Sequence, residues 1–199
     1  LIRSDTFSLP IGDKFTLENY VTAFKRVDIG TAYVNSIVIS GAVTVVVMVL
    51  AGLAAYAMVR YSFRLRGFLH SMIIASMMFP VFSTLIPVFR MESSWGIVNT
   101  GSIWLTRLSV VLPQIAGNLS FAIIVLMGFI RSLPVDLEEA AYLEGYNVYQ
   151  IFFRIIMPLA KPSFATVGIF TFLWSYNDLF LQMFFLRSKK FFTITRLLN

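Results

Sequence analysis

The chain has 199 residues, 58% of them hydrophobic and only 13% charged, and this balance excludes an ordinary soluble domain. It has no cysteine and one histidine, so a thiolate site or a histidine cluster is excluded and we expect no metal. The net charge of +6 comes from basic residues scattered among polar segments, without the basic helix face typical of nucleic-acid binding. No G-x-x-x-x-G-K-[ST] pattern occurs, so we expect any nucleotide to be bound by another chain.

The chain opens on a mixed, polar segment, residues 1–32. It lacks the basic start and apolar core of a signal peptide. Within it, residues 16–24 carry apolar side chains on one face after a threonine, and this pattern predicts a short amphipathic helix. The chain ends shortly after its last apolar segment.

Four apolar segments follow. Charged residues are absent from 29–59, 67–89 and 108–130, and each of these runs exceeds the roughly 20 residues that cross a bilayer as a helix. A fourth run is long enough if Asp178 is accepted within it. No repeat or linker divides the chain, so we expect one all-α, polytopic transmembrane domain with four spans. The spans are expected at about residues 33–59, 68–89, 108–130 and 163–185.

Several features of these spans bear on packing and transport. Pro80 and Pro87 predict kinks in the second span. Polar residues within membrane spans face neighbouring helices or water, so Asn118, Asn177 and Asp178 are expected to line a pore or to hold helices together. We expect Asp178 near the outer end of its span, facing protein or water, because a lipid-facing carboxylate costs about 2.5–3.5 kcal/mol on insertion scales.

The connector between the third and fourth spans predicts a first short helix that ends at a glycine. Pro134 suits the first turn of a helix, where a missing N–H is no loss. Asp136, Glu138 and Glu139 follow, where carboxylates meet the positive end of the helix dipole. Gly145 can adopt the left-handed conformation that ends a helix without steric cost.

A second helix is predicted after this glycine. Asn147 is a good N-cap, and Gln150 three residues later completes a capping box. Apolar residues then recur at helical spacing and form one stripe, which we interpret as a docking surface for a partner. The stripe consists of Val148, Ile151, Phe152, Ile155 and Ile156.

This connector resembles the EAA loop of permease subunits of binding-protein-dependent ABC importers. That loop reads E-A-A, three residues, G, nine residues, I-x-L-P, and Met157 takes the place of the leucine here. The segment Trp174-Ser175-Tyr176-Asn177-Asp178 and the runs Ala54–Ala57 and Arg60–Phe63 are similar to the carbohydrate-uptake branch, in particular to the second membrane subunit of maltose-type systems. The matching loop positions are Glu139, Ala140, Ala141, Gly145, Ile155, Met157 and Pro158.

The resemblance implies a type I ABC importer permease fold. Residues 1–32 would then be an extracytoplasmic segment and residues 33–199 the transmembrane domain, with a cytoplasmic coupling loop at about 131–161. We expect a fragment lacking the first and last spans, because relatives carry one span more at each end. The location implied is the bacterial or archaeal cytoplasmic membrane. The distribution of basic residues does not itself support this orientation, since only six of the sixteen lie on the side placed in the cytoplasm.

The resemblance also implies partners and roles. The partners are a cytosolic ATP-binding subunit dimer, which holds ATP and magnesium, a second permease subunit, an extracytoplasmic solute-binding protein and the membrane lipid. This chain would bind no cofactor and would not itself be an enzyme. Glu139 would be a charged anchor, Ala140 and Ala141 would allow close approach, and Gly145 would form the elbow. The solute would be an oligosaccharide or a polyol.

Three alternatives remain open from the sequence. The first is a transporter of the same class whose solute is phosphate, a polyamine or a peptide. A polytopic membrane enzyme needs paired carboxylates or a histidine partner inside the bilayer, and the spans offer only Asp178, with His70 at a helix edge. A scaffold membrane protein leaves the spacing of the EAA-like loop unexplained.

Overall fold

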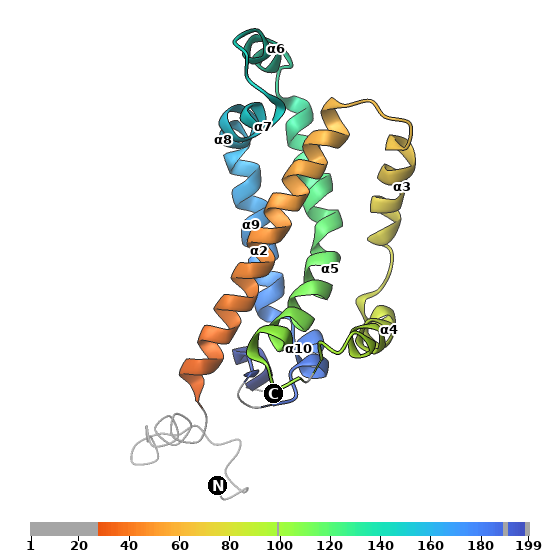
Figure 1. Ribbon diagram of the computed structural model, residues 1–199, viewed down its shortest axis with the longest axis vertical. Coiled ribbons are helices and arrows are strands. Elements are labelled where there is room, and N and C mark those ends of the chain that lie inside the picture. The colour runs from red at the N-terminus through yellow and green to blue at the C-terminus, as the bar shows by residue number, and fades with distance from the viewer. Residues whose placement is uncertain (1–27, 99, 189–190, 198–199) are drawn as a thin grey trace, which may run out of the picture.

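The computed structural model describes residues 28–98, 100–188 and 191–197, and the regular structure of these ranges is helical. Three helices form its body: α2 (Ile29–Arg60), α5 (Ile103–Ser132) and α9 (Lys161–Asn177). α2 packs along both α5 and α9 (Figure 1). The helix expected over residues 16–24 lies outside the described residues.

The first span is confirmed as a helix, α2, which begins at Ile29 because Asp28 caps it. The Asp28 carboxylate accepts hydrogen bonds from the backbone N–H of Thr31 at 3.0 Å and from the Thr31 hydroxyl at 2.6 Å. The helix therefore starts before residue 33, and residues 29–32 belong to it, not to the preceding segment.

The buried face of α2 is built from small and β-branched side chains. Val43, Val47, Ala51 and Ala55 recur at every fourth residue, and each is fully buried. Small side chains let helices approach closely, and in lipid this packing replaces the hydrophobic effect as the force between helices. The same core includes Ala122, Leu126 and Ile130 of α5 and Phe164 and Val167 of α9.

The second expected span is wrong as one continuous helix. The chain forms α3 (Arg66–Ser76) and α4 (Val81–Ser94), which point in different directions (Figure 1). The break lies at Pro80, whose backbone is extended. Proline lacks a donor for the preceding turn and disfavours helical angles in the residue before it, so the helix ends ahead of it. Pro87, by contrast, is accommodated inside α4.

The third expected span is confirmed as a helix, α5, but the fourth is divided. α9 ends at Asn177 and α10 (Phe180–Phe185) follows. Asp178 lies between them with extended backbone, and its carboxylate accepts a hydrogen bond from the backbone N–H of Leu181 at 3.1 Å. The carboxylate thus supplies an acceptor for the start of α10, which explains why the helix does not run through it.

Four spans are not confirmed. Among the described residues, α2 and α5 are long and apolar enough to cross a membrane. The helical stretches Val148–Leu159 and Lys161–Asn177 meet at a bend of 80°. They make a third span if the pair is counted as one. The remaining helices are shorter, and α4 and α10 lie at the end of the bundle opposite α6, α7 and α8 (Figure 1).

Candidate functional site

The EAA-like segment forms a compact elbow, residues 136–159, at one end of the bundle (Figure 1). Its first helix is α6 (Asp136–Leu143), with Asp136, Glu138 and Glu139 in the first turn as expected. Pro134 lies just before this helix and not in its first turn, which corrects that detail. The acidic side chains meet the partial positive charge of the free N–H groups at the helix start.

The elbow turns at Gly145, which has the positive φ of 85° that the sequence predicted. Two hydrogen bonds close the helix end: Gly145 N–H donates to the Tyr142 carbonyl and Tyr146 N–H to the Ala141 carbonyl, both at 3.0 Å. This pair of bonds is the Schellman motif, which requires a left-handed residue at this position. A Cβ at Gly145 would meet nothing within 4 Å, so glycine is needed for its backbone and not for space.

The second helix of the elbow starts with the expected capping box. Asn147 and Gln150 exchange side-chain to backbone hydrogen bonds, both of 2.9 Å. The helix proceeds as α7 (Val148–Ile151), a π-helical turn η3 (Phe152–Ile156) and α8 (Met157–Leu159). The π turn was not predicted, and such turns occur often at functional sites. The chain then bends into α9, and Pro158 and Pro162 are the second residues of α8 and α9.

The apolar stripe of the second helix faces the chain's own core, and this corrects its interpretation as a docking surface. Ile151, Phe152 and Ile156 are at most 2% exposed, whereas Val148 is 36% exposed. Ile155 is partly buried as well. Side chains already covered by the same chain do not form a surface for a partner. Helical periodicity marks the buried side of a helix without saying what buries it.

A different side of the elbow is exposed. Leu143 is 90% exposed, Tyr149 71% and Phe153 49%. Large apolar side chains that stay exposed on a short segment are typical of an interaction site. The EAA-like positions divide between the two sides of the elbow. Glu139, Ala140, Gly145 and Pro158 are exposed, Met157 is partly buried and Ala141 is buried.

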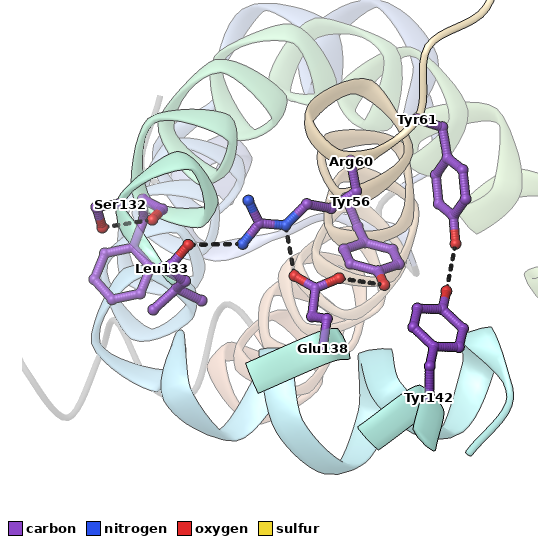
Figure 2. A network of polar contacts seen from close by, with 8 residues as sticks. Tyr56, Arg60, Tyr61, Ser132, Leu133, Glu138 and Tyr142 are labelled. Atoms are coloured by element: carbon purple, nitrogen blue, oxygen red, sulfur yellow. Dashed lines mark hydrogen bonds and ion pairs between the residues drawn. The ribbon is translucent and has the colours of Figure 1, made fainter. Parts of the chain in front are cut away.

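Glu138, which the sequence interpretation passed over in favour of Glu139, is the buried charge of the elbow. It is 4% exposed and accepts hydrogen bonds from Arg60 Nε at 2.5 Å and from the Tyr56 hydroxyl at 2.8 Å (Figure 2). Arg60 Nη2 also donates to the Leu133 carbonyl at 2.9 Å. Nothing in the local sequence separates Glu138 from Glu139, because the buried side of α6 depends on its contacts with α2.

A second contact lies beside this network. The hydroxyls of Tyr61 and Tyr142 are 3.1 Å apart (Figure 2). Partial burial raises the pKa of the Tyr61 hydroxyl, and its hydrogen bond with Tyr142 raises it further. Both hydroxyls are protonated at physiological pH, so either can donate in this contact.

The family model described as "binding-protein-dependent transport system inner membrane component" matches residues 26–198. The chain belongs to this family. The resemblance drawn from the EAA-like loop is thereby confirmed.

The members of this transport family that resemble the chain include permease proteins of sugar uptake systems. The diacetylchitobiose uptake system permease protein of Streptomyces coelicolor is 34% identical over 182 residues, covering 92% of this chain and 58% of its own length. The melibiose/raffinose/stachyose import permease protein of Bacillus subtilis is 30% identical, covering 90% of this chain and 63% of its own. The trehalose transport system permease protein of Mycobacterium tuberculosis is 35% identical, covering 84% of this chain and 59% of its own length. This chain thus spans about three fifths of the length of these relatives.

The fold of this permease family member also matches a solved structure. A chain of a bacterial ABC transporter involved in the import of the acidic polysaccharide alginate superposes with a TM-score of 0.75 at 25% sequence identity. The match covers 88% of this chain and 60% of that one. The expected ABC importer permease fold is therefore confirmed.

The polar residues expected to line a pore or to hold helices together behave differently from one another. Asp178 accepts a hydrogen bond from Gln114 Nε2 of α5 at 3.1 Å, so it faces protein, as expected. Asn118 is 9% exposed and donates to the Gln114 carbonyl at 2.8 Å. Asn177 is exposed and donates to the Leu173 carbonyl of its own helix.

Gln114 of α5 is the centre of this second polar cluster. Its Oε1 accepts a hydrogen bond from the Ser175 hydroxyl at 2.5 Å, and it is 2% exposed. Gln182 of α10 continues the cluster by donating to the Ser175 carbonyl at 3.1 Å. With both ends of its buried amide paired, Gln114 ties α5 to α9 and to Asp178, just before α10. No group of three His, Asp or Glu residues in the described part of the chain could hold a metal.

Proposed function

We propose that this chain is a transmembrane permease subunit of an ATP-driven importer that takes up a sugar, in particular a di- or oligosaccharide or a polyol. The observation that carries this proposal is the similarity, over nearly the whole chain, to permease proteins named for diacetylchitobiose, melibiose and trehalose. The similarity to a transporter of the polysaccharide alginate supports the same class of solute.

Coupling to ATP hydrolysis is assigned to the elbow. We infer that a cytosolic ATPase subunit binds its exposed side, with Leu143, Tyr149 and Phe153 as apolar contacts and Glu139 as the charged one. Exposed apolar side chains and an exposed carboxylate on one short segment suit a protein interface. This places the elbow in the cytoplasm, and ATP and magnesium in the partner. A second permease subunit and an extracytoplasmic solute-binding protein complete the importer.

The permease then has two conformational states, and the ATPase subunit changes their relative populations. Closure of the ATPase dimer would displace the elbow, and the attached helices would change between inward-open and outward-open arrangements. ATP shifts this equilibrium only by its differential affinity for the two states, so the elbow must differ in position between them.

The test is reconstitution of the complete importer, with the full-length chain and the subunits encoded beside it, in proteoliposomes. Uptake of labelled trehalose, melibiose and diacetylchitobiose is measured with and without ATP, against phosphate, spermidine and a short peptide. We expect saturable, ATP-dependent uptake of a sugar. Saturable uptake of phosphate, polyamine or peptide, with none of any sugar, would refute the assignment of the solute.

A further inference from the structure

One side of the last turns of α2 carries a row of residues that contact the elbow. Gly52, Tyr56 and Arg60 are four residues apart, so they lie on the same side of the helix. They fall within and next to the Ala54–Ala57 and Arg60–Phe63 runs that the sequence comparison singled out, to which no role has yet been assigned.

The first two members of the row make packing contacts with the second half of the elbow and with the start of α9. A Cβ at Gly52 would lie 2.8 Å from the Phe164 ring and 3.2 Å from the Phe152 ring, so these aromatic side chains lie against the bare backbone of α2. The Tyr56 ring packs on Phe152, with centroids 5.4 Å apart. The helix following the glycine turn is therefore seated on α2.

Polar contacts tie the first half of the elbow to the same row. Arg60 forms an ion pair with Glu138 of α6, and both side chains are shielded, at 11% and 5% exposure (Figure 2). Tyr56 donates to the second carboxylate oxygen of Glu138, and Arg60 uses another nitrogen for the Leu133 carbonyl. Both oxygens of the carboxylate are thus occupied, and its position relative to α2 is set by two donors.

A buried ion pair contributes little net stability, because desolvation offsets the attraction between the charges. Its effect is geometric: breaking it leaves an uncompensated charge, so the two elements stay in one relative position. This matters because α2 and α6 are far apart in sequence, Arg60 and Glu138 being separated by 78 positions. The elbow continues directly into α9 and follows α5 along the chain, whereas it is joined to α2 by non-covalent contacts.

We propose that Arg60 and Glu138, held by Tyr56, are positioning residues that make α2 and the elbow one rigid unit. A displacement of the elbow by the ATPase is then transmitted to α2 directly, and not only through the bend into α9. This inference rests on the proposed transport function, because it describes how that function's driving step reaches the longest helix of the described chain.

The first test measures coupling in the complete importer in proteoliposomes. Arg60→Ala and Glu138→Gln should each lower ATP-driven uptake per assembled complex by roughly tenfold, a typical size for the loss of a coupling interaction. Binding of the ATPase subunit and its basal hydrolysis should persist, because the exposed side of the elbow is unchanged. Arg60→Lys keeps a cation beside Glu138 and should recover most of the uptake. Arg64→Ala and Asp136→Asn change the same charges at exposed positions and serve as controls.

The second test measures the rigid unit itself and needs no knowledge of the solute. The chain has no cysteine, so a pair of cysteines for spin labels can be introduced at Leu50 of α2 and Leu137 of α6, which are 45% and 42% exposed. In the wild-type background, the distance between the labels should be the same with and without ATP. With Arg60→Ala, the distribution should broaden or become nucleotide-dependent.

Two results would overturn the inference. One is a label distance that changes with nucleotide in the wild-type background, since α2 and the elbow would then move separately. The other is an Arg60→Ala loss explained entirely by lost ATPase binding, with Arg60→Lys equally impaired, since the contact would then serve assembly alone. A wild-type importer without sugar uptake would refute the proposed solute, and the label distances would still decide this inference.

Discussion

Replacing Gly145 with valine should change the angle between the two halves of the elbow through its effect on the backbone. A Cβ there meets nothing within 4 Å, so the perturbation is confined to the backbone, whose φ is 85°. A β-branched residue enters this region with strain of about 1–3 kcal/mol. That strain corresponds to a decrease of roughly 5–150-fold in the population of the native turn relative to other conformations. The Schellman hydrogen bonds of Gly145 and Tyr146 would be lost with the turn.

The assay compares ATP-driven uptake and retention of the ATPase subunit among three variants. We expect activity to fall in the order Gly145→Asn, Gly145→Ala, Gly145→Val, because asparagine tolerates the left-handed region best and valine least. The protein should still insert in the membrane, since the turn lies outside α2, α5 and α9. Gly67→Val is the matched control: that site has equally open space but no positive φ.

The reasoning would be refuted by a Gly145→Val protein that transports at the wild-type rate. It would also be refuted if Gly145→Asn were as impaired as Gly145→Val, because the loss would then not depend on backbone conformation.

Three further predictions concern the exposed side of the elbow, the second polar cluster and the packing of α2. Glu139→Lys should reduce copurification of the ATPase subunit, because it reverses an exposed charge at the proposed contact, and unchanged binding would contradict this. Asp178→Ala should lower the yield of assembled importer, because it leaves buried donors unpaired at a cost of about 1–3 kcal/mol. Asp178→Asn should have a smaller effect, and the affinity for the solute should be unchanged in both variants. A selective change in that affinity would instead indicate a role in the pore. Gly52→Ala should lower the free energy of unfolding by about 1–3 kcal/mol, because the new methyl overlaps the Phe164 ring. The loss is measured as a lower melting temperature of the detergent-solubilised protein. Gly41→Ala, where nothing lies within 4 Å, should be neutral by comparison.

Local features of this chain were determined by the sequence. The charge-free runs predicted α2 and α5, because only a helix satisfies every backbone hydrogen bond within a single apolar segment. The left-handed Gly145 and the capping box of Asn147 and Gln150 were also predicted correctly. Each of these depends on residues within a few positions of one another, so the local sequence carries enough information.

Other features were decided by the tertiary structure. The sequence showed that Ile151, Phe152 and Ile156 share one side of a helix, but only the fold shows that the chain's own core buries them. The sequence predicted a kinked helix at Pro80 and a continuous helix through Asp178. In the structure Pro80 separates α3 from α4, and Asp178 separates α9 from α10. The sequence drew attention to Glu139, whereas the buried ion pair belongs to Glu138, whose partner Arg60 lies 78 positions away. The physical reason is common to all three: periodicity and local propensity describe one helix, and what a side chain touches depends on which distant segment packs against it.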